Sequence, residues 1–305
     1  MRLALVCVAL IGWEIAACQG AAKADEGISA STTRQSLGVA SIPQTLLRRN
    51  ESPTQAGGGP ALPQATVDVT MPSVTGRSLP VHAGDNLQAV LDSAQAGDEI
   101  VVQAGATFVG PFTLPVKSGS GWIIIRSSGT LPAVGTRVGP SNAAQMPKLV
   151  SQYATEPVIA TAAGAHNYRL VGLEITASDT ATQAGALVAL GDGSQAQNTV
   201  ALVPHDLVLD RVYVHGTATL NFQRCVALNS GATGIVDSYL SECHGKGFDS
   251  QAIAGWNGTG PYRIEDDYLE AAGENMMLGG ADPSIPNMLP RDIVIRRNHF
   301  YKPAA

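Results

Sequence analysis

The sequence predicts an all-β solenoid, a parallel β-helix, from three observations. Pairs of apolar residues with the same five-position offset recur along the second half of the chain, at Leu170/Ile175, Leu209/Val214, Ile235/Leu240, Ile264/Leu269 and Ile295/Phe300. A second apolar run recurs at a matching place, at Val188-Ala189-Leu190, Val226-Ala227-Leu228, Ala252-Ile253-Ala254 and Met276-Met277-Leu278. The composition, with 33 Gly and 5% aromatic residues, suits many strands and tight turns. A period of about 30 residues is typical of solenoids, in which each repeat buries its apolar face against its neighbours.

Residues 1–24 are predicted to be an export signal. A positively charged start precedes an apolar run over residues 3–13, which is too short to span a bilayer as a helix. The run ends near Ile15-Ala16-Ala17-Cys18, which is typical of bacterial lipoprotein signals and would make Cys18 the site of lipidation. Ala22-Lys23-Ala24 fits an ordinary cleavage site instead, and both alternatives remain open. We therefore expect an exported protein that is periplasmic, extracellular or an outer-membrane lipoprotein.

Residues 25–76 are predicted to be a disordered linker. The segment is dominated by Ser, Thr, Gln, Gly and Pro, and it offers too little apolar surface to offset the entropy of ordering it. The net charge of the whole chain is -6, without the clustered basic surface that a nucleic-acid partner would require. We expect a monomer whose partner is a polysaccharide.

The β-helix domain is predicted over residues 77–305, with a short capping helix near its start. Asp85 is the expected N-cap, apolar residues follow with helical spacing from Leu87, and Gly97 is expected to end the helix. Such a helix would cover the open end of the apolar lumen. At the other end the last repeat reaches Phe300 near the end of the sequence. We expect either that the chain is a fragment of a longer protein, which we favour, or that another chain covers this end.

Two cysteines, Cys225 and Cys243, lie in the predicted domain. An exported protein can form a disulfide between them. Alternatively, they are two small buried side chains stacked inside the coil, which is the interpretation we favour from the sequence. The sequon Asn257-Gly258-Thr259 is interpreted as a coincidence in a glycine-rich turn rather than a glycosylation site.

Several stretches resemble the pectin-lyase-like right-handed parallel β-helix superfamily. The residues that carry the resemblance are the helix-then-strand opening over 84–102, Phe248-Asp249-Ser250-Gln251-Ala252-Ile253 with Gly255-Trp256-Asn257-Gly258, Glu274-Asn275-Met276-Met277-Leu278, and the ending Ile295-Arg296-Arg297-Asn298-His299-Phe300. These stretches are similar to bacterial secreted parallel β-helix repeat proteins. The resemblance covers about residues 80–305 and implies a right-handed coil. It leaves activity open, because the superfamily includes lyases, hydrolases, esterases and adhesins.

Outward positions before each second anchor form a predicted row of Glu174, Tyr213, Tyr239, Tyr268 and His299. Rungs about 4.8 Å apart would place these side chains on one face. The tyrosines, together with Trp256, are candidate substrate-binding residues that could stack on sugar rings. The alternative is an aromatic ladder that needs no ligand.

A second predicted row lies in the turn after each first anchor. Asp267 and Asn298 occupy this position in the last two repeats, where their side chains are expected to satisfy backbone groups of the turn. We assign these two residues a structural role.

The richest polar loop contains the candidate catalytic residues His244, Lys246 and Asp249. A lyase acting on a uronate needs a base for the proton next to the carboxylate, and His244 or Lys246 could supply it. Arg263 or Arg224 could pair with the carboxylate group.

Acidic residues near this loop allow two further roles. Asp249 with Glu270 or Glu274 could hold Ca²⁺ through oxygen ligands, and Ca²⁺ is the one cofactor that we expect. A hydrolase would instead need two carboxylates, for which Asp249 and Glu274 are the first pair to test. The Asn-Thr-Asp motif of polygalacturonases and the Arg-centred motif of calcium pectate lyases do not occur. The sequence therefore favours a polysaccharide lyase ahead of a hydrolase, with a non-catalytic glycan-binding module as the alternative.

Overall fold

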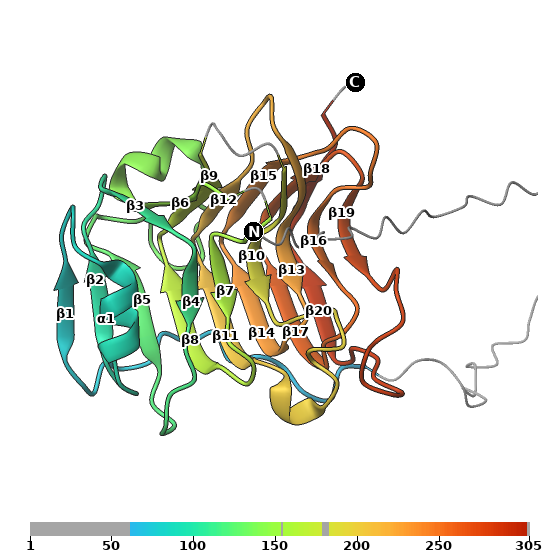
Figure 1. Cartoon of the computed structure of the whole chain (residues 1–305), viewed down its shortest axis with the longest axis horizontal. Coiled ribbons are helices and arrows are strands. Elements are labelled where there is room, and N and C mark those ends of the chain that lie inside the picture. The colour runs from blue at the N-terminus through green and yellow to red at the C-terminus, as the bar shows by residue number, and fades with distance from the viewer. Residues whose placement is uncertain (1–61, 154, 179–182, 304–305) are drawn as a thin grey trace, which may run out of the picture. The chain divides into compact units, whose positions relative to one another are not determined.

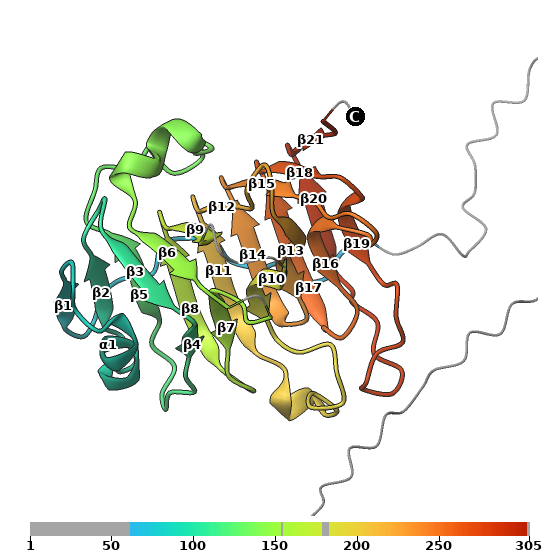
Figure 2. The same cartoon turned by 45° about the horizontal axis from the view of Figure 1, so that its top comes forward.

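Strands in the computed structural model stack into three parallel sheets that wind around one apolar lumen (Figures 1 and 2). The structure describes residues 62–153, 155–178 and 183–303. Sheet A contains β1 (Ser78–Val81), β2 (Glu99–Val102), β5 (Ile123–Ser127), β8 (His166–Val171), β11 (His205–Asp210), β14 (Gly231–Val236), β17 (Gly260–Glu265) and β20 (Ile293–Arg296). Sheet B contains β3 (Thr107–Gly110), β6 (Lys148–Ser151), β9 (Glu174–Ala177), β12 (Tyr213–His215), β15 (Tyr239–Cys243), β18 (Tyr268–Ala271) and β21 (His299–Tyr301). Sheet C contains β4 (Phe112–Leu114), β7 (Ile159–Thr161), β10 (Gln183–Leu190), β13 (Asn221–Leu228), β16 (Gln251–Gly255) and β19 (Glu274–Leu278).

The predicted right-handed parallel β-helix is confirmed, and its strands form three ladders. The two members of each apolar pair lie in different sheets: Leu209 is in β11 and Val214 is in β12. Between them Arg211 adopts a left-handed conformation, with φ of 49°. Such a residue turns the chain sharply within two positions. A short turn of this kind is difficult to recognise in a sequence because Arg, Asp and Gly all occupy it in different repeats.

The paired apolar residues fill the lumen as expected. Leu209, Val214, Ile264 and Leu269 are each 0% exposed, and the same positions align across neighbouring strands. In the last described rung, in contrast, Ile295 is 47% and Phe300 is 50% exposed. No further rung packs on these two side chains among residues 62–303, and this explains their exposure.

Helix α1 (Leu87–Ser93) covers the first rung, with Leu87 and Leu91 buried against the lumen. The predicted N-cap is wrong by one residue, because the side chain of Asn86 accepts the hydrogen bond from the amide of Ala89. The carboxylate of Asp85 accepts from the amide of His82 instead. The helix also ends four residues before Gly97, which adopts φ of 96° in the turn that enters β2.

Residues 62–76, the end of the predicted linker, run along the outer face of sheet A. The amide of Gln64 donates to Asp292 just before β20, and the guanidinium of Arg169 in β8 donates to the carbonyl oxygen of Thr70 at 3.1 Å. The segment reaches the first rung where the amide of Gly76 donates to Gly97. It therefore spans the sheet from its last strand to its first. The predicted signal, Cys18 and the rest of the linker lie outside the described residues.

Cys225 in β13 and Cys243 in β15 form a disulfide across the lumen, and both residues are 0% exposed. Of the two alternatives left by the sequence, the disulfide is the one observed. It connects sheet C to sheet B. Two short 3-10 helices, Pro140–Gln145 and Val200–Leu202, lie in loops outside the coil. No helix in the described part of the chain is long and apolar enough to cross a membrane.

The turns between sheets A and B carry the predicted ladder of polar side chains. Asp267 accepts from the amide of Ser238 at 2.8 Å, and Asn298 accepts from the amide of Asp267 at 2.8 Å. The amide group of Asn298 also donates to the carbonyl of Ile264. The second carboxyl oxygen of Asp267 is buried without a hydrogen-bond partner. Complete burial raises the pKa of Asp267 well above its usual value, which favours the protonated side chain.

We expect Asp267→Asn to remove a pH-dependent loss of stability. Below pH of about 4 the carboxyl group is protonated in both the folded and unfolded chains. As the pH rises, the unfolded chain loses this proton first, so the free energy of unfolding falls by up to about 1.4 kcal/mol per pH unit until the folded group also ionises. The variant has no proton to lose. In urea denaturation from pH 4 to pH 8, the free energy of unfolding of the variant should increase relative to that of the wild type as pH rises. A difference that stays constant with pH would contradict the raised pKa of Asp267.

Candidate functional site

A groove lies over the outer face of sheet C. It has a volume of about 630 Å³, and its floor is made of small residues on successive strands, Ala160 in β7, Ala189 in β10 and Ala227 in β13. Ala186 and Gly185 of β10 also line it. Because these residues carry little or no side chain, the floor is low, and the loops beyond the strand ends rise above it as a wall.

The wall consists of the loops that follow β10, β13 and β16, and buried amide side chains join them. Gln197 donates to the carbonyl oxygens of Asn229 and Asn257, both at 2.8 Å. The side chain of Asn229 accepts from the amides of Trp256 and Asn257. The side chain of Asn257 donates to the carbonyl oxygens of Asp192 and Gln197. These interactions fix the three loops relative to one another.

Asn257 is 0% exposed, which agrees with its interpretation as part of a turn rather than a glycosylation site. Its side-chain oxygen also accepts from the amide of Ser284 in the next loop. The indole of Trp256 donates to the carbonyl oxygen of Gly193 at 3.0 Å, so the ring is held against the neighbouring loop. Trp256, a predicted substrate-binding residue, therefore lines the groove.

Arg224 in β13 also lines the groove, and its guanidinium lies 5.1 Å from the centre of the Trp256 ring. Its Nη1 donates to the side chain of Gln223, while its Nε is buried without a hydrogen-bond partner. None of the described carboxylates forms an ion pair with it. Burial lowers the pKa of the guanidinium, because the charged form loses hydration. A cation that is half-buried, unpaired and open to a cavity is a site for an anionic ligand.

The row that contains Arg224 continues on the next two strands with Gln251 and Glu274. The amide of Gln251 donates to the carboxylate of Glu274 at 2.8 Å, and this hydrogen bond lowers the pKa of Glu274. The side-chain oxygen of Gln251 is buried and has no partner. An unsatisfied acceptor therefore lies one strand from the unsatisfied donor of Arg224.

The polar loop with His244, Lys246 and Asp249 lies at the edge of sheet C where the strands begin. The amide of Phe222 in β13 donates to the carbonyl of His244, and the amide of Lys246 donates to the side chain of Asn221. The amide of Gly273, just before Glu274, donates to Ser250. The structure thus brings His244, Lys246, Asp249 and Glu274 to one edge of the sheet that carries Arg224.

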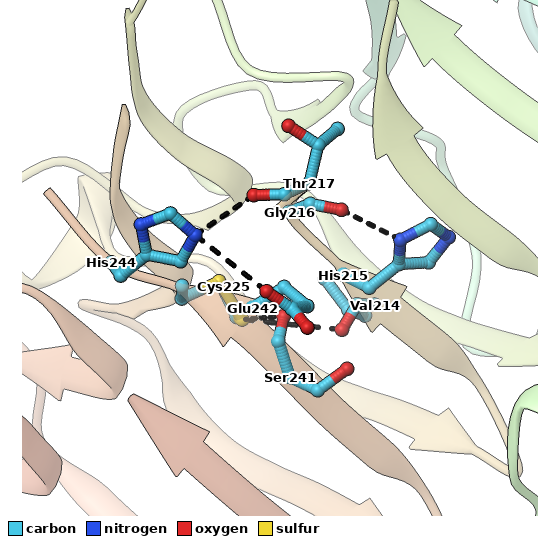
Figure 3. The surroundings of a disulfide bond; sticks show 9 residues. Val214, His215, Gly216, Thr217, Cys225, Ser241, Glu242 and His244 are labelled. Atoms are coloured by element: carbon cyan, nitrogen blue, oxygen red, sulfur yellow. Dashed lines mark hydrogen bonds and ion pairs between the residues drawn. A yellow bond between two sulfur atoms is a disulfide. The ribbon is translucent and has the colours of Figure 1, made fainter. Parts of the chain in front are cut away.

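His244 is held in one orientation (Figure 3). Its Nε2 lies 2.8 Å from the carbonyl oxygen of Thr217, which can only accept, so Nε2 carries the hydrogen. The carboxylate of Glu242 lies 3.6 Å from the same nitrogen. In the neutral ring the lone pair is then on Nδ1, which points away from Thr217 and Glu242 and has no described partner. This nitrogen is available to accept a proton.

His215, one rung earlier, lacks a free nitrogen. Its Nδ1 bonds to the carbonyl of Gly216 at 2.7 Å and its Nε2 bonds to Glu174 at 3.1 Å. Lys148 pairs with the same carboxylate. Burial alone would raise the pKa of Glu174, but the hydrogen bonds from His215 and Lys148 outweigh it and lower the pKa. These residues form a closed cluster on the outer face of sheet B.

The predicted tyrosine row lies on this same face of sheet B. Glu174, Tyr213, Tyr239, Tyr268 and His299 align strand by strand, as the sequence indicated. The rings contact one another: Tyr239 and Tyr268 stack with centroids 4.1 Å apart, and Tyr213 meets Tyr239 edge-on. Burial raises the pKa of Tyr213 to about 12, so its phenol stays protonated near neutral pH.

Two other predicted residues lie away from the groove. Glu270 is in β18 of sheet B, where its carboxylate accepts from the hydroxyl of Tyr268 at 2.9 Å. Arg263 is in β17 of sheet A, where it pairs with Glu265 and donates to the carbonyl of Val67 in the N-terminal segment. Of the two arginines predicted to pair with a carboxylate, Arg224 lines the groove, whereas Arg263 lies in a different sheet and already has an acidic partner.

A metal site is not assembled by the described residues, among which no three His, Cys, Asp or Glu side chains lie close enough to hold an ion. Asp249 precedes a strand of sheet C whereas Glu270 belongs to sheet B, so the fold places this predicted pair on two faces.

Sequence reasoning missed Gln251, the amide-joined wall and the alanine floor. The floor did leave a signal, because Ala189 and Ala227 are the middle residues of the second apolar runs, flanked on both sides by lumen residues. A small residue at that place in successive repeats marks an outward position where bulk is excluded. The wall left no comparable signal, since its loops differ in length and sequence from rung to rung.

No family model and no curated protein matches this sequence. Among solved structures, the chain is similar to an alginate lyase from Paenibacillus sp. str. FPU-7, with 14% sequence identity and a TM-score of 0.33, covering 73% of this chain and 99% of that one. It is also similar to the PL6 family alginate lyase AlyGC, with 13% identity and a TM-score of 0.25, covering 78% of this chain and 41% of that one. Likenesses at these identities and scores leave the question of activity to the chemistry of the site.

Proposed function

We propose that this protein is an exported polysaccharide lyase that binds an acidic glycan in the groove over sheet C and cleaves it by β-elimination beside a uronate. The observation that carries the proposal is the unpaired guanidinium of Arg224, which is half-buried over Trp256 in the groove of about 630 Å³. A uronate carboxylate is the anion that a glycan supplies, and a guanidinium binds carboxylates through charge-assisted hydrogen bonds.

The neighbouring groups suit the rest of a sugar acid. The exposed hydroxyl of Ser194 lines the same groove and can bond to a sugar hydroxyl, while Arg224 donates to the carboxylate. The alanine floor leaves room for the flat apolar face of a pyranose ring.

The elimination step requires a base and a means of stabilising negative charge. In the proposed reaction Nδ1 of His244, or alternatively the amine of Lys246, removes the proton on the carbon next to the carboxylate. The electron pair forms a carbon–carbon double bond, the glycosidic carbon–oxygen bond breaks, and a proton is returned to the leaving oxygen. Arg224 stabilises the charge that develops on the carboxylate as the proton leaves. The chain end that is released carries an unsaturated sugar.

A hydrolase that uses Asp249 and Glu274 is less well supported. The general acid of a glycosidase must hold a proton at neutral pH, and this requires a raised pKa. The pKa of Glu274 is lowered by the hydrogen bond from Gln251. Glu274 could therefore serve only as the base or nucleophile of a hydrolase, and Asp249 would have to be its acid. A glycan-binding module without catalysis remains the second candidate, since Arg224 and the groove would serve binding equally well.

Two further features support the proposal of export. The apolar run near the N-terminus has the length of a signal sequence. The disulfide between Cys225 and Cys243 requires an oxidising compartment to form and persist. Lipidation at Cys18 is part of the proposal for a membrane-anchored form, and retention of a Cys18→Ser variant in membranes would contradict it.

We expect Arg224→Gln to abolish most binding and cleavage of acidic polysaccharides. Removing a charge-assisted contact costs about 1.5–3 kcal/mol, or roughly a ten- to hundredfold loss of affinity. Affinity should be measured by calorimetry, and cleavage by the ultraviolet absorbance of unsaturated chain ends. New reducing ends without that absorbance would indicate a hydrolase, and binding without either product would indicate a binding module. Undiminished binding by the variant would refute the groove as the site.

Gly193→Ala tests the same groove without changing a charge. A methyl group at Gly193 would overlap the Trp256 indole, so the ring that covers Arg224 must move. We expect a shift in tryptophan emission together with weaker binding. Gly139→Ala is the matched control, since its added carbon would meet only Tyr239 at an ordinary distance of 3.8 Å, above sheet B.

His244→Ala separates catalysis from binding. If Nδ1 is the base, this variant loses cleavage but keeps most of its affinity, because the contact between Arg224 and the carboxylate remains. Lys246→Ala is the parallel test of the alternative base. Full activity in both variants would exclude the loop as the source of the base.

A further inference from the structure

The groove carries very little charge for a site that binds an acidic polymer. Of the residues that line it, Arg224 and Asp192 alone are charged, and their charges cancel. The remaining lining is Trp256, alanine, glycine and proline together with uncharged polar residues such as Thr161, Ser194 and Asn229. Lys246 lies in the loop at the edge of the sheet, outside this lining.

The charges are also ordered along the solenoid. The row on successive strands of sheet C reads Ala186, Arg224, Gln251 and Glu274, that is, neutral, positive, neutral and negative. The first two positions line the groove, and the last two continue the row beyond it. The strands are about 4.8 Å apart, so a glycan that follows the axis passes one of these positions roughly with each rung. A single position in the row can pair with a carboxylate.

A polymer made only of uronates presents a carboxylate on every sugar. One carboxylate could pair with Arg224, but those on either side would face Ala186 and the Gln251–Glu274 end of the row. The carboxylate facing Ala186 would lose water without gaining a partner. The carboxylate at the other side would approach the ionised side chain of Glu274. Uncharged sugars flanking the bound uronate avoid both costs.

We infer that the groove selects a heteropolysaccharide in which uronate residues are separated by uncharged sugars, in preference to a homopolymer of uronates. This inference rests on the proposed binding of a uronate at Arg224. Arg224 holds the one carboxylate, and accessible hydroxyl side chains of the lining such as Thr161 and Ser194 receive the hydroxyl groups of the flanking sugars. The acidic side chains Asp192 and Glu274 act as selectivity groups against a second carboxylate.

The test compares affinities of the purified exported protein for two sets of polymers of matched length, each with Ca²⁺ and with chelator. Hyaluronan, unsulfated chondroitin and gellan contain separated uronates, and polymannuronate, polyguluronate and polygalacturonate are homopolymers. The best of the first set should bind at least about tenfold more tightly than any homopolymer. Since one ion pair is formed, the dependence of its affinity on salt should be shallow, near one counterion per site by analogy with polyelectrolyte binding.

In Glu274→Gln and in Asp192→Asn, the preference for polymers with separated uronates should become smaller. These variants should raise the affinity for homopolymers more than the affinity for hyaluronan, unsulfated chondroitin or gellan. Arg224→Gln in the same assay separates the selectivity from the proposed function. Tightest binding of a homopolymer, lost in Arg224→Gln, would overturn the selectivity while leaving the proposed function intact. A preference for a homopolymer that arises only with Ca²⁺ would overturn the selectivity in the same way. If none of the polymers bound in a way that depends on Arg224, both the selectivity and the proposed function would be overturned.

Discussion

Asp210→Ala is expected to lower the free energy of unfolding by about 3–5 kcal/mol, the largest effect that we expect of a single substitution in this fold. Asp210 is 0% exposed, and Arg169 beside it is 1% exposed. The carboxylate accepts from Nη2 of Arg169 at 2.8 Å and from Nε of Arg211 at 2.7 Å. Without it, two guanidinium groups stay buried and lose the carboxylate that pairs with both of them. Urea denaturation measures the loss.

The result depends on burial, and an exposed pair provides the control. Asp206 pairs with His205, and their side chains are 45% and 49% exposed. Asp206→Asn should change stability by well under about 1 kcal/mol, because water screens this pair and solvates either partner alone. If Asp210→Ala cost no more than Asp206→Asn, the buried cluster would not be the electrostatic anchor of sheet A. Arg169 also holds the carbonyl of Thr70, so the variant should expose the N-terminal segment to proteolysis.

The second large effect is expected from the disulfide. We expect the free energy of unfolding to fall by about 3 kcal/mol in Cys225→Ala, in Cys243→Ala and in the double variant. The crosslink closes a loop with a sequence separation of 18 and so restricts the unfolded chain. Cys225 follows Arg224, and Cys243 precedes His244. Loosening the crosslink should therefore also weaken glycan binding. Denaturation should be measured with and without a reducing agent.

The reducing agent provides the internal control for this prediction. Reduction should bring the wild type close to the stability of the double variant, while the variant itself should not respond. A wild type whose stability does not change on reduction would show that the cysteines are merely buried together, the alternative that the sequence favoured. The double variant tests the crosslink with little change in packing volume, since alanine keeps the Cβ atoms of both buried residues.

Much of the fold was predictable because its signal is periodic. The five apolar pairs and the second apolar runs repeat at a spacing that only stacked rungs explain, and every one of these residues can be read directly from the chain. The ladder of Asp267 and Asn298 and the row of Tyr213, Tyr239 and Tyr268 follow from that alignment alone, since residues one repeat apart must become neighbours.

The site was predictable in part. The polar loop stood out because His244, Lys246 and Asp249 occur together in sequence, and the fold places this loop at the edge of sheet C, the sheet that carries the groove. Arg224 and Arg263 could not be told apart, because both are arginines on strands, and only the sheet to which each strand belongs separates them. The N-terminal segment that covers Arg263 lies 196 positions away from it in sequence.

The sequence by itself determined the solenoid, its capping helix and the residues that share a face, because apolar periodicity dictates which side chains leave water. Tertiary structure alone decided which face carries the groove. The groove depends on loops of unrelated sequence that meet through Gln197, Asn229 and Asn257, and on whether each buried charge has found a partner. Arg169 and Arg263 have acidic partners, whereas Arg224 has none among the described residues. Such pairing is a property of positions in space, so no local pattern in the chain records it.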